Sequence, residues 1–164
     1  MDDFVIPFKG LDVGNHRYDF KIGKSFFEHY AYFETDRGEI SLRLDLEKET
    51  NLMVFRFALE GYMTLACDRC LAEFDFPVKG EFRLIVKFGE TYQEESDEVI
   101  VIPAMDSRLD ISQYVFEFVN LMLPIQKTHP DISQCDKTVV EKLAKTSKET
   151  RDPRWDALRD IKLK

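Results

Sequence analysis

Three cysteines and one histidine of this 164-residue chain fall into two close pairs. Cys67 and Cys70 stand three positions apart in LACDRCLAEF, and His129 precedes Cys135 by six positions in THPDISQC. Two pairs of ligands contributed by separate chain segments are a common way to build a tetrahedral zinc site. The spacing therefore predicts a closed Cys3His site, which would be structural because no coordination position is left open for a substrate.

Two other interpretations use the same residues. The cysteines could carry no metal, with His129 and Cys135 simply placed in a loop, because a Cys-x-x-Cys pair alone is not diagnostic of zinc. A redox role of the thioredoxin type requires the first cysteine at a helix N-terminus, where the helix dipole lowers the thiol pKa. Here the residues after Cys70 have the pattern of a strand, which disfavours redox catalysis. Arg69, between the two thiols, would offset thiolate charge around a metal.

Motifs of enzyme active sites are otherwise missing from the sequence. There is no GxSxG, no HExxH and, with 7 glycines in the whole chain, no phosphate-binding glycine loop. The carboxylates are numerous, but no pair is singled out for acid–base catalysis. We therefore expect a protein that is not an enzyme. If the chain is an enzyme, the remaining alternative is a metal-dependent or redox enzyme.

The elements that must position these residues are mostly strands over the first hundred residues. Apolar and polar residues alternate over 40–46 and 53–59, with a hairpin loop at 49–51 between them. Further strands are expected at 4–8, 18–22, 61–67, 73–78, 81–88 and 99–102, a short helix at 25–30, and a mobile acidic loop before residue 99. The predicted fold class is α+β: a mainly antiparallel sheet or open barrel over about residues 1–102, followed by C-terminal helices.

Those helices are expected over about 110–123, 137–147 and 153–161. Apolar residues recur every three or four positions in the first of them, and Asp152-Pro153 is a typical start for the last. We expect residues 1–136 to form a single domain that includes both ligand pairs. Residues 137–164 would form a basic helical tail packed on it or extending from it.

Charge is distributed unevenly along the chain. The formal net charge is −8, yet residues 137–164 carry nine Lys/Arg against five Asp/Glu. An acidic body with a basic tail is consistent with nucleic-acid contact through the tail, and equally with a solvated helix surface. The candidate residues for contact with RNA or a protein partner are Arg69, Arg151, Arg154, Trp155 and Arg159. For Trp155, a side chain docked on the body is slightly favoured over contact with a partner.

The cellular compartment follows from three observations on the sequence. Three cysteines do not make a disulfide framework. No stretch approaches the roughly 20 apolar residues that span a bilayer. The first residues, MDDFVIPFKG, lack the basic and apolar regions of a signal peptide. A cytoplasmic protein is the simplest expectation.

Three segments in order resemble the YceD family, the large ribosomal RNA subunit accumulation proteins. They are LACDRCLAEF, RLDISQYVFEFVNLMLPIQKTHPDISQC and DPRWDALRDIK. The resemblance spans about residues 60–164 and implies a cytoplasmic factor that is not an enzyme and supports accumulation of large-subunit rRNA. By resemblance, the shared loop cluster comprises Cys67, Arg69, Cys70, His129 and Cys135, and the shared tail comprises Pro153, Trp155 and Leu158.

The leading hypothesis is thus a ribosome-biogenesis factor without enzymatic activity, which contacts large-subunit rRNA or an assembling ribosomal protein. The alternative is a protein-interaction adaptor whose acidic surface binds a basic ribosomal protein or an RNA-processing enzyme without touching RNA. Zinc is the one cofactor that the sequence suggests, and no small-molecule substrate or membrane partner is evident.

Overall fold

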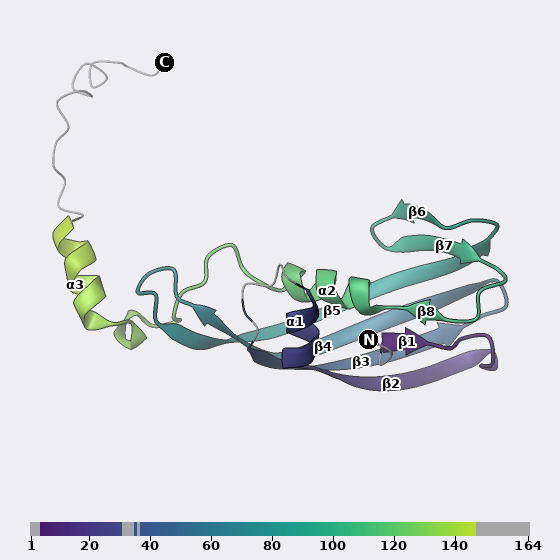
Figure 1. Cartoon of the computed structure of the whole chain (residues 1–164), viewed down its shortest axis with the longest axis horizontal. Helices are drawn as coiled ribbons and strands as arrows, with labels where there is room; N and C mark the ends of the chain where they lie inside the picture. The colour runs from purple at the N-terminus through teal and green to yellow at the C-terminus, as the bar shows by residue number, and fades with distance from the viewer. Residues whose placement is uncertain (1–3, 31–34, 36, 147–164) are drawn as a thin grey trace, which may run out of the picture.

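The computed structural model describes residues 4–30, 35 and 37–146, and its centre is one six-stranded sheet (Figure 1). The strand order is β2-β3-β4-β5-β7-β6. The strands are β2 (Gly14–Ile22), β3 (Gly38–Lys48), β4 (Leu52–Ala66), β5 (Glu73–Gly89), β6 (Gln93–Ser96) and β7 (Val99–Pro103). A separate two-stranded ribbon pairs β1 (Val5–Ile6) with β8 (Leu109–Asp110).

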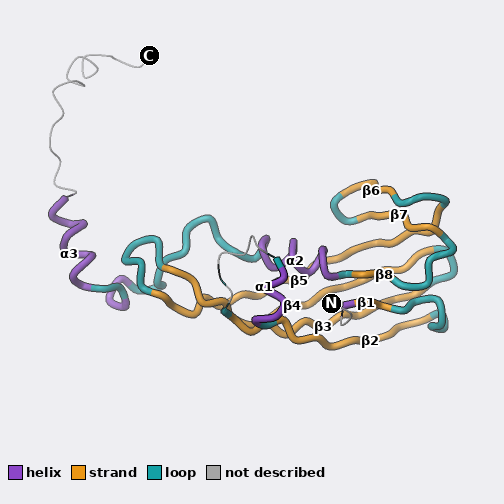
Figure 2. The backbone as a smooth tube through the Cα atoms, in the orientation of Figure 1, coloured by secondary structure: helices purple, strands orange, loops and turns teal. Residues whose placement is uncertain are grey.

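Short helices complete the described part of the chain. They are α1 (Lys24–His29), α2 (Ser112–Leu121), the 3₁₀ turn η2 (Ile132–Gln134) and α3 (Lys137–Thr146). Strands dominate the first hundred residues and helices follow them, which confirms the predicted α+β class (Figure 2). The sheet is open, with β2 at one edge and β6 at the other, so it does not close into a barrel. One pairing, β5 with β7, is parallel, which makes the sheet mixed.

Strands β4 and β5 form a ladder far longer than the alternation predicts. Breaks expected near residue 60 and near residues 79–80 are wrong, because Gly61 pairs with Val78 and Gly80 with Leu59 inside the ladder. A Cβ atom on Gly61 would collide with the backbone carbonyl oxygen of Glu39 on β3. Gly61 therefore allows two backbones to approach closely, which is a common reason for a glycine inside a strand.

The core lies on one face of this sheet, under α1, α2 and the β1–β8 ribbon. Alternate residues of β3 and β4 point into it, in agreement with the predicted period of two. Helix α1 contributes Phe26 and Phe27, and α2 contributes Val115, Phe118 and Val119. The ring of Phe118 stacks on Phe82 of β5 at a centroid distance of 4.4 Å. The packing of α2 on the sheet thus explains its broad apolar face.

Two local predictions differ from the structure. The acidic segment before residue 99 contains a strand, β6, which pairs with β7 and is not simply a loop. The helix expected from about residue 110 begins at Ser112, with Ile111 as its N-cap. Asp110 belongs to β8, and its Oδ1 accepts a hydrogen bond from the backbone N–H of Ser112. The periodicity of so short a strand, broken by a bulge between Glu94 and Ser96, is too weak to be detected in the sequence.

The C-terminal prediction falls largely outside the described residues. Helix α3 agrees with the helix expected at 137–147, while the helix expected at 153–161 lies in the part that the structure does not describe. The division into a domain at 1–136 and a tail at 137–164 stays a prediction. Within the described residues, no helix is both long and apolar enough to cross a membrane.

Candidate metal centre

The first ligand pair lies in the tight connection between β4 and β5. Cys67 directly follows β4, and its backbone N–H donates to the carbonyl of Ala72 at 2.9 Å. The N–H of Leu71 donates back to the carbonyl of Cys67 at 2.8 Å. Leu71 has a φ of 62°, the left-handed conformation that glycine adopts at low cost. This turn reverses the chain so that Cys67 and Cys70 face the same point.

The second pair lies in the loop between α2 and α3. The carboxylate of Asp131 accepts a hydrogen bond from the N–H of Ser133 and starts the short turn η2, at whose end lies Cys135. Asp136 then accepts from the N–H of Thr138 at 2.8 Å, at the start of α3. These two side-chain-capped turns fix the backbone on both sides of Cys135.

A reciprocal pair of hydrogen bonds joins the two loops. The N–H of Asp68 donates to the carbonyl of Lys127 at 2.7 Å. The N–H of Lys127 donates to Oδ2 of Asp68 at 2.6 Å. Asp68 lies beside Cys67, and Lys127 lies two positions before His129. The loops are therefore held against each other by contacts that do not involve the candidate ligands.

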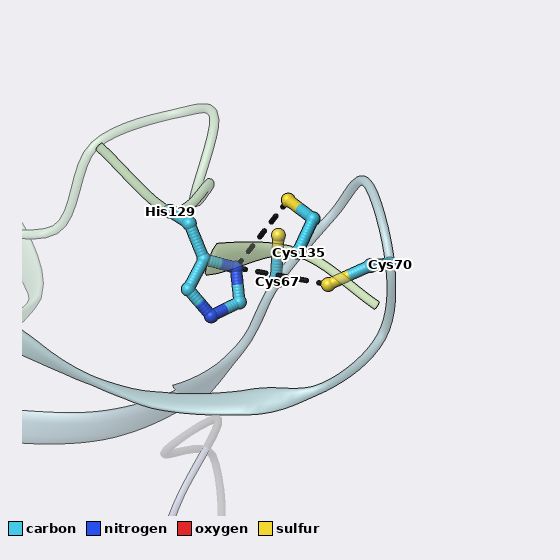
Figure 3. A group of neighbouring side chains, drawn as sticks. All are labelled: Cys67, Cys70, His129 and Cys135. Atoms are coloured by element: carbon cyan, nitrogen blue, oxygen red, sulfur yellow. Dashed lines mark hydrogen bonds between the residues drawn. The ribbon is translucent and has the colours of Figure 1, made fainter. Parts of the chain in front are cut away.

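The four candidate ligands converge on one point (Figure 3). Every pair among their four donor atoms lies within 4.8 Å. The Nδ1 atom of His129 lies 3.6 Å from the sulfur of Cys70 and 3.6 Å from that of Cys135. All four side chains are buried: Cys67, Cys70 and Cys135 are 0%, 4% and 5% exposed, and His129 is 8% exposed.

This geometry fits a tetrahedral zinc ion. With Zn–S near 2.3 Å and Zn–N near 2.0–2.1 Å, a tetrahedron places nitrogen and sulfur ligands about 3.6 Å apart and two sulfurs about 3.8 Å apart. The observed Nδ1–Sγ separations of 3.6 Å equal the first value. A maximum separation of 4.8 Å requires only a small inward movement of the donor atoms. Three thiols and an imidazole are also the donor types that zinc prefers.

The surroundings of Cys67 favour the deprotonated thiolate that binds metal, whereas those of Cys135 favour the protonated thiol. Burial raises the pKa of Cys67, but hydrogen bonds from the backbone N–H groups of His129, Arg69 and Cys70 together lower it to about 6. Burial raises the pKa of Cys135, against the opposing effect of the Arg69 guanidinium. The Nη1 atom of Arg69 donates to the Cys135 sulfur at 3.6 Å. A cation next to this donor set offsets part of its negative charge when three thiolates are present.

Apolar groups surround the cluster and orient the histidine. The ring of Phe74, on β5, packs against the imidazole of His129 at a centroid distance of 4.5 Å. Val139 and Val140 of α3 also pack against the cluster of three cysteines. Such a shell excludes water and restricts the imidazole to one orientation, which leaves Nδ1 directed at the sulfurs.

The structure brings together all four predicted metal ligands, with Arg69 beside them. That these four residues bind a metal ion, and that Arg69 contacts a partner, both stay predictions. Arg151, Arg154, Trp155 and Arg159 lie outside the described residues. Sequence reasoning missed Asp68 and Phe74. Asp68 accepts a hydrogen bond from a backbone N–H, which every residue type except proline carries, so the sequence does not reveal its partner. Phe74 is one of 14 phenylalanines, and nothing in the sequence distinguishes it from the others.

Comparison with known proteins gives one family match. Residues 55–162, about two thirds of the chain, match the family described as large ribosomal RNA subunit accumulation protein YceD. No curated protein and no solved structure matches the chain. The matched region includes the turn that carries Cys67 and Cys70, helix α2 and the loop that carries His129 and Cys135. The chain therefore belongs to the YceD family of large ribosomal RNA subunit accumulation proteins.

Proposed function

We propose that this chain is a cytoplasmic ribosome-biogenesis factor without enzymatic activity, which supports large-subunit rRNA accumulation by contacting rRNA or an assembling ribosomal protein. The observation that carries this proposal is the family match over residues 55–162, whose family description names large-subunit rRNA accumulation. The contacts themselves, including any made by Arg69 and by the C-terminal arginines and Trp155, are part of the proposal.

The metal centre has a structural role in this proposal. Cys67, Cys70, His129 and Cys135 would hold one zinc ion, which supplies the cross-link between the β4–β5 turn and the loop before α3. Four protein donors fill a tetrahedral shell, so no position is open to activate water or polarise a substrate. The ion would thereby fix the start of α3, whose Val139 and Val140 pack on the cysteines. Support for this role comes from the burial of all four donors.

Sedimentation of cell extracts tests the function directly. In a sucrose gradient, the epitope-tagged chain should travel with precursors of the large subunit and leave them as salt concentration rises, if phosphate contacts contribute. Deletion of the gene should lower the ratio of large-subunit to small-subunit rRNA. A normal rRNA ratio in the deletion strain, with the protein at the top of the gradient, would contradict the proposal.

A matched variant separates the metal centre from general instability. Cys67→Ser with Cys70→Ser should reduce large-subunit rRNA as deletion does. The control, Ser41→Ala on the exposed side of β3, should restore the wild-type ratio. Equal abundance of the two variants in cells, checked by immunoblot, is required for the comparison.

A further inference from the structure

A groove separates helix α2 from the β6–β7 hairpin and lies away from the metal centre. It has a volume of about 850 Å³. The hairpin is at the end of the sheet opposite to the candidate metal ligands, which lie beyond β4 and toward α3 (Figure 1). The groove thus belongs to a surface that the candidate metal site does not use.

The floor of the groove is apolar. Ile100 of β7 and Phe118 of α2 are 2% and 7% exposed, and Phe116 is half-buried beside them. At the rim, Leu121 exposes 71% of its surface and Tyr92 exposes 52%. A large aliphatic side chain and an aromatic ring at the edge of an apolar hollow provide contact area for an apolar side chain of a partner.

The rim of the groove is acidic. Glu94 and Asp97 line it from the hairpin, and Glu117 lines it from α2. All three are exposed. Among the described residues that line the groove, none is a lysine or an arginine. The hydrogen-bond donors to Glu94 and Glu117 are neutral groups, the Tyr92 hydroxyl at 2.7 Å and the Gln113 amide at 2.8 Å, and not cationic side chains.

Neighbouring carboxylates of the hairpin behave differently. Glu95 pairs with Lys87 at 2.7 Å and Glu98 pairs with Arg83 at 2.7 Å, both across to β5. The hairpin therefore carries two kinds of carboxylate. Glu95 and Glu98 form ion pairs with β5, whereas Glu94 and Asp97 line the groove. The hydrogen bond that the Tyr92 hydroxyl donates to Glu94 raises the pKa of Tyr92.

The segment that builds the groove also concentrates the charge of the chain. Residues 88–124 contain eight Asp/Glu and a single Lys/Arg. Two of these eight acids, Glu95 and Glu98, pair with Lys87 and Arg83 just outside the range, which leaves a local excess of five negative charges. A local field of this size attracts cationic partners and repels nucleic-acid phosphates.

We propose that this groove binds a lysine- and arginine-rich polypeptide segment with an apolar anchor residue. The anchor would contact Leu121 and the apolar floor, and the cationic side chains would meet Glu94, Asp97 and Glu117. Tyr92 offers a ring face to a guanidinium or an ammonium group. The link of this segment to a ribosomal protein rests on the proposed function, whereas the binding chemistry rests on the groove alone. RNA is disfavoured as the occupant by the sign of the charge.

Binding of a defined peptide tests the groove. The probe is a fluorescein-labelled 14-residue peptide of lysine and arginine with two central leucines, titrated with the full chain and followed by fluorescence anisotropy. The groove variant combines Glu94→Gln, Asp97→Asn and Glu117→Gln, which keep the side-chain shapes. The control variant combines Glu39→Gln, Glu49→Gln and Glu141→Gln, three exposed positions outside the groove with the same change in net charge.

The groove variant should bind the peptide about tenfold more weakly, since each exposed charge pair contributes about a twofold change in affinity. The control variant should stay within about twofold of the wild type. Equal losses in the two variants would show attraction by overall charge and overturn the proposal, as would failure of the wild type to bind the peptide. Loss of binding to a single-stranded RNA of equal length in the groove variant alone would assign the groove to RNA and also overturn it.

The apolar contribution is tested separately. Leu121→Ser should weaken binding of the leucine peptide about fivefold and leave a peptide with serine in place of both leucines unaffected. Met105→Ser, at a position 80% exposed and outside the groove, is the control and should change neither. Peptide binding is measured with purified protein. A normal rRNA ratio in the deletion strain would therefore contradict the proposed function but leave the peptide-binding result valid. Conversely, an unchanged affinity of the groove variant for the peptide would contradict only the groove proposal.

Discussion

Asp68 and Lys127 hold each other through two hydrogen bonds, although 58 residues separate them in the sequence. One bond uses the backbone N–H of Asp68 and the other uses its carboxylate. Because each residue lies within two positions of a candidate metal ligand, this clamp holds the two ligand pairs together through contacts that do not involve the ligands. A site prepared in this way costs less conformational entropy when metal binds.

Removal of the clamp should weaken zinc binding. Asp68→Ala leaves the Lys127 N–H without its carboxylate acceptor, and we expect zinc affinity to fall by about tenfold to a hundredfold. The free energy of unfolding of the loaded protein should fall by about 1–3 kcal/mol. Competition with a chromogenic chelator measures the affinity. Asp12→Ala, at an exposed position remote from the loops, is the control, and an equal loss in both variants would argue against the clamp.

The aromatic contact to the histidine should matter for metal rather than for the sheet. Phe74→Leu removes the ring that packs on His129, and we expect zinc to dissociate about tenfold faster. The control is Phe88→Leu, on the same strand, where the ring packs against Phe8. It should lower the free energy of unfolding about as much as Phe74→Leu does, without changing the rate of zinc dissociation. Stopped-flow transfer of zinc to a chelator separates the two. Equal dissociation rates in both variants would refute the orienting role of Phe74.

Leu71, which has a left-handed backbone conformation after the Cys-x-x-Cys pair, is a position where substitution should raise stability and not lower it. A non-glycine residue in this conformation costs roughly 1–2 kcal/mol. Leu71→Gly relieves that cost but adds freedom to the unfolded chain, worth about 0.5–1 kcal/mol. Leu71 is 76% exposed, so little packing is lost. We expect the free energy of unfolding, measured with urea, to stay equal or rise by up to about 1.5 kcal/mol, with zinc retained. A loss of more than about 1 kcal/mol would contradict the assigned turn.

The close approach of β3 and β4 can be tested at Gly61. Gly61→Ala places a methyl group against the carbonyl oxygen of Glu39 and within 2.7 Å of the Ile40 Cα, and neither backbone atom can move away easily. We expect a loss of about 2–4 kcal/mol in the free energy of unfolding, in the range of severe packing defects. Gly10→Ala, where the added Cβ meets nothing within 4 Å, should change it by less than about 0.5 kcal/mol. Similar losses at both positions would disprove the crowding.

Much of this structure could be predicted from the sequence because its signals are periodic or chemically specific. The alternation over 40–46 and 53–59 marks β3 and β4 because one face of the sheet is buried. The two ligand pairs meet as their spacing predicts. Gly61 and Gly80 misled the interpretation because a glycine that ends a strand and a glycine that leaves room for neighbouring atoms have the same local signature. Gly61 leaves room for the β3 backbone, and Gly80 leaves room for the side chains of Phe82 and Met122. The parallel pairing of β5 with β7 depends on tertiary packing, which the sequence pattern does not encode.

Metal content is the most direct test that these loops are joined by zinc. Native mass spectrometry of the untagged full chain should show one zinc ion per chain, absent from the Cys67→Ser, Cys70→Ser double variant. The control variant, Ser41→Ala, should retain the ion. A metal-free wild type with the same cooperative urea unfolding before and after zinc is supplied would contradict the central claim.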